Sequence, residues 1–298
     1  MYSNTVRVGG LYIDGQEKFG PSSEPTVVPL CLPKDHLNNV LLGITTLQLR
    51  LIYFPWTSPV YHGLLELRLT GYQDCISITR LQLANMLGAS PQLRILEFGL
   101  HIEKESPLNT PAVPIHLMHL EALDLTMCLR VDVEFLLQWL APGSRPLQLS
   151  LPCCHPMSAI GELASSMEPF LSRSNMATLH VMKYDFACAS ALIDASPKLQ
   201  TLVVERVQRG LPVNKYQARA GPRELKSLYL LDSFVILEDL VKFLELWPTQ
   251  TLVLWRTKFD SDSYPGGRVS SDAVLQELSR VCGDVQWVSE SAPNPTKI

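Results

Sequence analysis

The segment Ala195-Ser196-Pro197-Lys198-Leu199-Gln200-Thr201-Leu202-Val203-Val204 contains the pattern that decides the fold. A proline-containing turn leads directly into a short run in which Leu202 and Val204 are two residues apart. Alternate residues of a strand point to opposite sides, so this pair would share one buried face. A similar turn, Ala89-Ser90-Pro91-Gln92-Leu93, begins 106 residues earlier and also precedes an apolar pair. The chain therefore repeats one structural unit.

The apolar pair occurs nine times, at intervals of 20 to 30 residues, usually with a third apolar residue three positions earlier. The pairs are Leu47/Leu49, Leu67/Leu69, Leu96/Phe98, Leu123/Leu125, Leu149/Leu151, Leu179/Val181, Leu202/Val204, Leu228/Leu230 and Leu252/Leu254. Periods of about 20 to 29 residues with this spacing are typical of leucine-rich repeats, which bury their apolar faces by stacking on their neighbours. The predicted fold class is therefore α/β: a right-handed leucine-rich-repeat solenoid (horseshoe) with a parallel concave sheet and convex helices.

Six segments between the strands have the apolar spacing of helices, and several end at a proline that stops the helix. They cover approximately residues 79–88, 132–141, 158–172, 186–195, 237–247 and 271–282. Asp132 is a candidate N-cap for the second of them.

The period extends through most of the chain, so residues 31–288 are expected to form one repeat domain. Residues 1–30 contain glycines, prolines and serines without the repeat pattern, which predicts an irregular leader or an N-terminal cap. Residues 289–298, with Pro293 and Pro295, are expected to form a disordered tail.

The amino-acid composition argues against two classes of function, nucleic-acid binding and membrane association. The net charge of −4 provides no basic surplus to neutralise phosphates, so nucleic-acid binding is not predicted. The N-terminus lacks the apolar stretch of a signal peptide and no apolar run reaches membrane-spanning length, so no membrane contact is predicted. The seven cysteines are scattered and odd in number, which favours reduced thiols and a location in the cytoplasm or nucleus.

The combinations closest to a metal site are Cys153-Cys154-His155 and His116-x-x-His119. Neither has the two close ligand pairs of a zinc site. Cys128 and Cys154 instead occupy the position after the leucine pair where such repeats place Asn or Cys. We therefore predict that both are buried free thiols and that the chain binds no metal.

No motif for an activated nucleophile and no phosphate-binding loop is present, since Gly266-Gly267 lacks the residues that would follow in such a loop. The sequence therefore predicts no catalytic residue and no cofactor. A hydrolase with an unrecognised site is the outside alternative.

The residue between each apolar pair is expected to face away from the core, on the concave surface. In chain order these residues change from polar to apolar, and they predict a protein-binding surface. Its candidate anchor residues are Val203, Tyr229, Leu231, Val253 and Trp255, and its candidate orienting charges are Arg68, Glu97 and Asp124. In the alternative interpretation, the segment containing Val285, Trp287 and Val288 folds over the apolar residues as a cap.

The segments Trp56–Leu69 and Ala89–Phe98, with the helical segment between them, resemble the leucine-rich-repeat region of fungal F-box-like proteins. The resemblance covers about residues 40 to 260. It implies the substrate receptor of a cullin-RING ubiquitin ligase, in which an F-box binds a Skp-type adaptor and the repeats bind the protein to be ubiquitinated.

The sequence departs from this family at the F-box itself. Leu32–Leu41 begins with the Leu-Pro of an F-box, but the first repeat strand follows by Leu47 and leaves no room for the remaining helices. A Skp-type adaptor is therefore expected only if an F-box exists upstream. Without one, the chain would be a free-standing repeat scaffold or inhibitor.

Overall fold

The computed structural model describes residues 43–50, 53–71, 76–103, 114–153, 160–207, 223–260 and 270–296. The leader predicted at residues 1–30 and the Leu-Pro segment at residues 32–41 lie outside them. The chain divides into two compact units, an N-terminal unit of residues 1–147 and a C-terminal unit of residues 148–298. Each unit is described by itself.

The protein is a mixed α/β protein with a long parallel sheet, which has ten strands in the described residues. Their order in the sheet follows the chain: β1 (Thr46–Arg50), β2 (Glu66–Thr70), β4 (Ile95–Gly99), β7 (Ala122–Asp124), β9 (Leu147–Leu151), β10 (Met176–Met182), β11 (Thr201–Glu205), β12 (Leu225–Leu231), β14 (Thr249–Trp255) and β16 (Cys282–Val288). The nine predicted pairs lie in the first nine strands, with Leu125 directly after β7. The prediction of parallel strands at the repeat positions is confirmed.

The register aligns equivalent residues of successive repeats. Leu202 in β11 lies beside Leu179 and Leu228, and Leu252 follows Leu228 in the next strand. All four side chains have no solvent exposure. Because parallel strands are about 4.8 Å apart, these leucines form one continuous buried row. The inward assignment of the apolar pairs is therefore confirmed.

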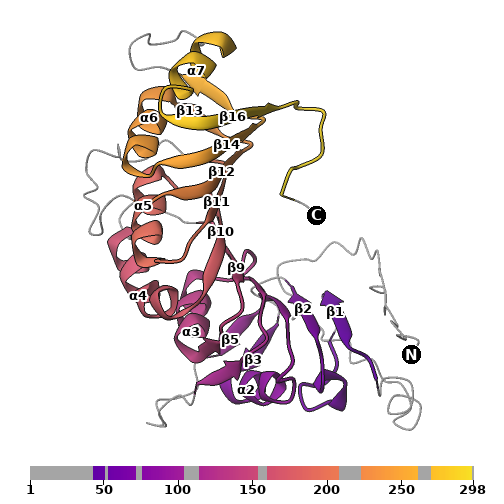
Figure 1. Ribbon diagram of the computed structural model, residues 1–298. Coiled ribbons are helices and arrows are strands. Elements are labelled where there is room, and N and C mark those ends of the chain that lie inside the picture. Colours follow the sequence, from indigo (N-terminus) through magenta and orange to yellow (C-terminus); the bar gives the residue numbers. More distant parts are fainter. Residues whose placement is uncertain are drawn as a thin grey trace, which may run out of the picture. The chain divides into compact units, whose positions relative to one another are not determined.

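The six predicted helices are present in the described residues, each within a few residues of its expected bounds. They are α2 (Arg80–Gly88), α3 (Arg130–Trp139), α4 (Ile160–Arg173), α5 (Phe186–Ala195), α6 (Leu237–Leu246) and α7 (Ser271–Leu278). In the C-terminal unit, α4 to α7 lie on one side of the sheet and leave the other side open (Figure 1). None of the helices in the described part of the chain has the length and apolar character that a membrane crossing requires.

The prediction of Asp132 as the N-cap of α3 is wrong. The helix begins one residue after Leu129, which makes no side-chain cap. The buried Asp132 carboxylate instead accepts a hydrogen bond from the Ile102 backbone N–H at 3.2 Å and lies 3.2 Å from His101 Nδ1. It therefore connects α3 to the neighbouring repeat rather than to its own first turn.

Short strands outside the main sheet pair with one another in three separate two-stranded sheets within the described residues. These pairs are β3 (Ser77–Thr79) with β5 (His101–Glu103), β6 (Ile115–Leu117) with β8 (Leu140–Pro142), and β13 (Phe234–Ile236) with β15 (Lys258–Asp260). The apolar-pair pattern did not predict them.

A row of left-handed residues ends four successive strands of the C-terminal unit. Lys183, Arg206, Asp232 and Arg256 each directly follow a strand, with φ of 59°, 55°, 47° and 50°. The backbone N–H groups of the first three donate to Glu205, Leu231 and Trp255 in the next strand, at 2.7, 2.8 and 2.9 Å. We call these four residues the edge row.

Candidate protein-binding face

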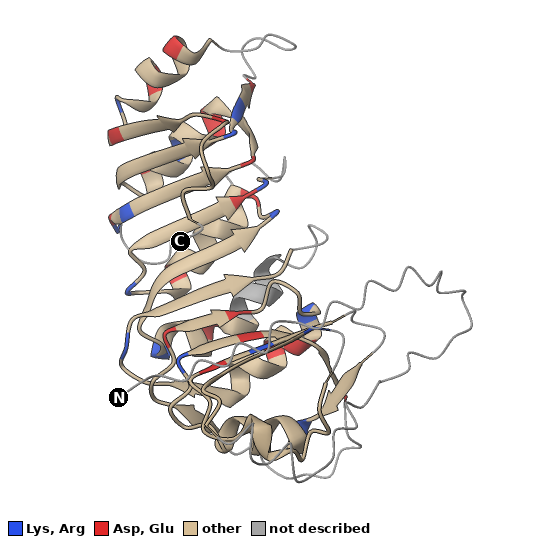
Figure 2. Cartoon of the chain, turned by 90° about the vertical axis from the view of Figure 1, so that its right-hand side faces the viewer, with Lys and Arg blue, Asp and Glu red and all other residues tan. Residues whose placement is uncertain are grey.

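The open face of the C-terminal unit is the side of its sheet opposite the helices. Register places Val203 beside Tyr229, Tyr229 beside Val253, and Leu231 beside Trp255. The five predicted anchor residues therefore lie together on three adjacent strands, as the repeat spacing indicated. Figure 2 views this face and shows charged residues mainly at the strand ends, while the strand middles carry uncharged residues.

The anchor residues are more buried than the sequence predicted. Val203 and Val253 are each 4% exposed, Leu231 is fully buried and Trp255 is 8% exposed, whereas Tyr229 is half-buried. Val203, Leu231 and Trp255 pack together, with Tyr229 and Val288 against them. We call these five residues the apolar cluster. These side chains are therefore less exposed than expected for residues that face away from the core, because they and the chain end cover one another.

The chain end covers the cluster in a different way from the predicted cap. Residues 282–288 do not fold over the sheet but extend it as β16, in which Trp287 is aligned with Leu254 and Val288 with Trp255. Trp287 contacts Phe259, with ring centroids 5.8 Å apart, and Val288 adds to the apolar cluster. The tenth strand therefore continues the repeat register beyond the nine predicted pairs.

Residues 289–296, which the sequence suggested were a disordered tail, make contacts on the open face. The Trp255 indole Nε1–H donates to the Ala292 carbonyl at 3.1 Å, and Arg256 Nε–H donates to the Glu290 carbonyl at 3.3 Å. The Arg256 guanidinium lies over the Trp255 ring, 4.4 Å from its centroid. These contacts are part of what shields Trp255.

Charged groups line the strand ends beside the cluster. Arg206 lies 3.1 Å from an Asp232 carboxylate oxygen and 3.8 Å from a Glu205 oxygen, and His180 Nε2 lies 3.3 Å from the other Glu205 oxygen. Hydrogen bonding to Asp232 and the charge of Glu205 raise the pKa of Arg206. The sequence did not predict this group because His180, Glu205 and Asp232 belong to three successive repeats, and only the register of the strands brings them together.

The three charged residues predicted to orient a partner lie in the N-terminal unit, and each has a partner within the chain. Arg68 lies 2.5 Å from Glu66 and 3.1 Å from Glu97. Burial disfavours the charged guanidinium, but hydrogen bonds and charge attraction from Glu66 and Glu97 outweigh it and raise the pKa of Arg68. Asp124 accepts hydrogen bonds from the Thr126 N–H and hydroxyl at 2.9 and 2.7 Å.

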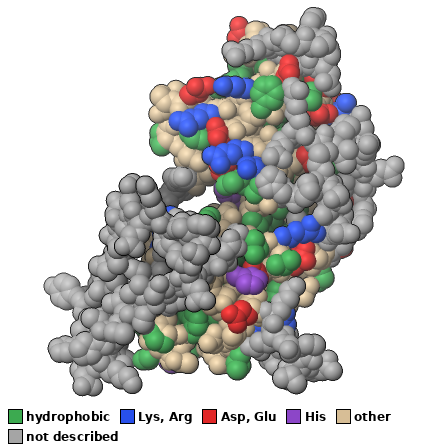
Figure 3. All heavy atoms as spheres, turned by 180° about the vertical axis from the view of Figure 1, so that it is seen from behind, with side chains coloured by type: hydrophobic (Ala, Val, Ile, Leu, Met, Phe, Trp, Pro, Cys, Tyr) green, Lys and Arg blue, Asp and Glu red, His purple; other side chains and the backbone are tan. Residues whose placement is uncertain are grey.

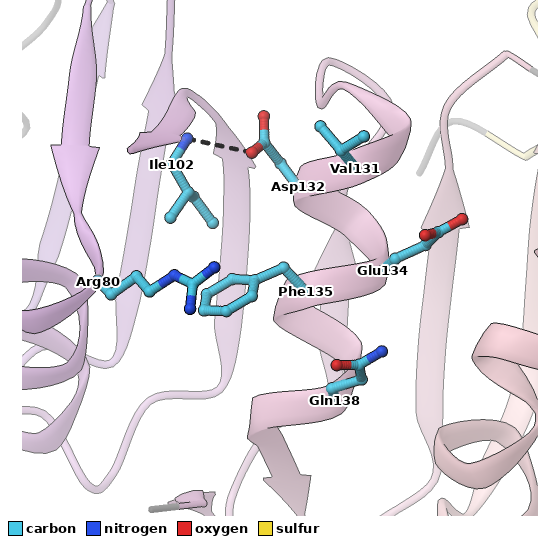
Figure 4. A pocket seen from close by; sticks show the side chains of 7 residues that line it. All are labelled: Arg80, Ile102, Val131, Asp132, Glu134, Phe135 and Gln138. Atoms are coloured by element: carbon cyan, nitrogen blue, oxygen red, sulfur yellow. Dashed lines mark hydrogen bonds between the residues drawn. The ribbon is translucent and has the colours of Figure 1, made fainter. Parts of the chain in front are cut away.

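A separate pocket of about 200 Å³ lies on the helical side of the N-terminal unit. It is lined by Arg80, Ile102, Val131, Asp132, Glu134, Phe135 and Gln138 (Figure 4). The Arg80 guanidinium lies 4.0 Å from the Phe135 ring centroid. The Asp132 carboxylate is used by His101 and Ile102, and Glu134 forms an ion pair with Arg130. Asp132 therefore holds α3 against the adjacent repeat, whereas the Glu134 ion pair lies within the helix.

Exposed apolar residues outside the open face are dispersed. The large ones include Leu65, Leu81, Met118, Met127, Val131 and Phe234. On the face seen in Figure 3, apolar side chains lie between charged and polar ones. Single exposed apolar residues are normal in soluble proteins and do not mark a site.

Cys128 occupies the predicted structural position. Its buried thiol donates to the Phe98 carbonyl at 2.9 Å, between neighbouring repeats. Burial raises the pKa of the thiol well above its usual value, and the carboxylates of Asp132 and Asp124 act in the same direction. The prediction that Cys128 is a buried free thiol is confirmed, whereas Cys154 and His155 lie outside the described residues.

We expect Cys128 to react with a maleimide at least about 100-fold more slowly in the folded protein than in urea, because the reactive thiolate is both scarce and inaccessible. Timed labelling followed by peptide mass spectrometry measures the two rates. Cys153, which is half-buried, is the internal control and should show a smaller ratio. A folded-state rate for Cys128 within about tenfold of the unfolded rate would contradict its assignment as a protected thiol.

Among the described residues, no group of three or more His, Cys, Asp or Glu side chains is arranged to hold a metal ion. Of the histidines considered as ligands, His116 is exposed and His119 is half-buried. No protein-family model matches the chain, and no curated protein matches it at a significant level.

Proposed function

We propose that the chain is a non-enzymatic protein-binding module that holds a partner protein on the open face of its C-terminal unit. The observation that supports this most is the apolar cluster with Tyr229 and Trp255, which lies on the sheet face without helices and is bordered by charged groups. Aromatic residues surrounded by a polar rim are the usual energetic centre of a protein interface.

Within this proposal the architecture is a leucine-rich-repeat solenoid, with the sheet on its concave side. Three observations favour it: strands that follow one another in chain order, the edge row that ends four successive strands in the same conformation, and the Cys128 thiol at the repeat's Asn/Cys position. Repeat proteins of this kind typically bind other proteins along their sheet.

The resemblance to fungal F-box-like proteins suggests which kind of partner protein the chain binds. The bound protein would be the substrate of a cullin-RING ubiquitin ligase, and a Skp-type adaptor would bind only through an F-box encoded upstream. The alternative is a free-standing scaffold or inhibitor that needs no adaptor. Both forms place the protein in the cytoplasm or nucleus and require no cofactor, nucleic acid or membrane.

The combined substitution Tyr229→Ala and Trp255→Ala is expected to reduce partner binding at least about 30-fold, because truncating an interface anchor typically costs about 2 kcal/mol or more. Partners captured from the native cell extract are identified by mass spectrometry, and their affinities are then measured with purified components. Phe234→Ala is the matched control, because it removes an exposed aromatic residue of the same unit from β13.

Circular dichroism and thermal unfolding first establish that each variant folds. If the double variant recovers the same partners with unchanged affinity, the apolar cluster is not the binding site. Equal losses in the double variant and in Phe234→Ala would also contradict the assignment, because they would indicate a general effect.

A further inference from the structure

The chain's own C-terminal segment provides an example of what the open face can bind. Residues 289–296 leave the end of β16 and turn back along the open side of the sheet (Figures 1 and 2). Ala292, Asn294, Pro295 and Thr296 are half-buried there. The segment adds no strand to the sheet, so its attachment depends on side chains of the face.

The contacts to this segment are made to its main chain. The carbonyls of Glu290 and Ala292 accept from Arg256 Nε–H and Trp255 Nε1–H, at 3.3 and 3.1 Å. Glu290 and Ala292 lie in a turn that is closed by the Ala292 N–H, which donates to the Ser289 carbonyl at 3.0 Å. The two side-chain donors therefore hold this turn by its main chain. The guanidinium stacked on the indole, 4.4 Å from the ring centroid, keeps both donors together.

The composition of the segment limits the conformations that it can adopt after this turn. Pro293 and Pro295 have a restricted φ and no N–H, and they keep the preceding residues, Ala292 and Asn294, out of the helical region. Prolines reduce the conformational entropy that a segment loses on binding, and aromatic side chains are common in surfaces that bind proline-containing segments. Here the aromatic residues are Trp255 and Tyr229, which pack in the apolar cluster.

We propose that Trp255, Arg256 and Tyr229 form a docking site for a proline-containing segment of a partner protein that begins with a turn, and that residues 289–296 occupy this site in the free chain. The proposal rests on the proposed function and specifies the partner's chemistry and its regulation.

Because residues 289–296 are joined to β16, they compete with a partner segment for the docking site. The segment directly follows Val288, the last residue of β16, so its effective concentration at the site is on the order of millimolar or higher. A partner segment of similar intrinsic affinity must displace it. Removal of residues 289–298 is therefore expected to increase the apparent affinity for an outside peptide at least about tenfold.

The test uses a fluorescein-labelled synthetic peptide with the sequence of residues 289–298, and its binding is followed by fluorescence anisotropy. It is titrated with the full-length chain, with a chain ending at Val288, and with a full-length chain in which residues 289–298 are replaced by a Gly/Ser sequence. If the truncated chain does not fold, the chain with the Gly/Ser sequence still allows the comparison. Circular dichroism checks folding in each case.

We expect the peptide to bind the two variants at least about tenfold more tightly than the full-length chain. In the Gly/Ser background, Trp255→Phe should weaken binding about fivefold, through loss of the indole donor, while Phe234→Ala should leave it unchanged. A peptide with Pro293→Ala and Pro295→Ala should bind more weakly because it loses more conformational entropy on binding.

Equal binding to all three proteins would overturn the proposal, because the segment would not be competing for the site. Absence of binding to both variants would overturn it as well, because the face would have no affinity for such a peptide. A full-length dimer that dissociates when the segment is replaced, seen by sedimentation velocity, would mean that the segment serves a second copy instead. None of these results decides the proposed function, which is tested separately by the Tyr229→Ala and Trp255→Ala double variant.

Discussion

Leu228→Ala is expected to lower the free energy of unfolding by about 2–5 kcal/mol, the range observed when a buried leucine is truncated and leaves a cavity. Leu228 lies in β12 with no solvent exposure, between Leu202 and Leu252 of the adjacent strands. The neighbouring strands are fixed by their own hydrogen bonds, so the space left by the side chain cannot close easily. Urea unfolding followed by circular dichroism measures the change.

Lys226→Ala provides the control, since Lys226 is an exposed residue of the same strand. Its substitution should change the free energy of unfolding by less than about 0.5 kcal/mol. A loss below about 1 kcal/mol for Leu228→Ala would contradict the assignment of the leucine row to the core.

Trp247→Ala is expected to cost about 3–5 kcal/mol, because a large aromatic side chain with no solvent exposure is removed. Trp247 directly follows α6, and its indole N–H donates at 3.0 Å to the hydroxyl of Ser190 in α5, 57 residues earlier in the chain. The side chain therefore joins two successive repeats both by packing and by a hydrogen bond.

Trp247→Phe separates the two contributions. Phenylalanine keeps most of the apolar volume but cannot donate to the buried Ser190, so a smaller loss of about 1–3 kcal/mol is expected. Thermal and urea unfolding of both variants give the comparison. If Phe and Ala at this position destabilise the protein equally, packing is not the main contribution of Trp247.

The architecture could be predicted because it depends on local, repeated information. Each apolar pair, such as Leu202 and Val204, needs only the two-residue period of a strand to be recognised. Recurrence of the pair then predicts parallel neighbours, since each unit must stack on the next. The helices followed from the same reasoning, and their bounds were correct to within a few residues.

The short strands and the tenth main strand could not be recognised in this way. β13 and β15 contain three residues each, too few to show a period, and they pair only because their repeats stack in register. β16 contains Gly283 and Asp284, which are unfavourable in strands, and it lacks the leucine pair. Its hydrogen bonds with β14 outweigh these local preferences.

The candidate site was predicted in position but not in exposure. Strand alternation correctly placed Tyr229 and Trp255 on the face away from the helices. It could not show that the carbonyl of Ala292, 37 residues after Trp255, lies against the indole. A contact of this kind depends on the path of a segment without periodicity, and nothing in the sequence of that segment specifies its destination.

The edge row has a consequence for the way the C-terminal unit comes apart. A left-handed conformation costs a non-glycine residue roughly 1–2 kcal/mol, and each of the first three residues of the row makes its backbone hydrogen bond only to the following strand. Loss of one repeat therefore leaves the preceding turn in its strained conformation without this hydrogen bond. These hydrogen bonds couple each repeat of the unit to the next. We therefore expect local unfolding to begin at the C-terminal repeat, and the remaining repeats of the unit to unfold together in one cooperative transition.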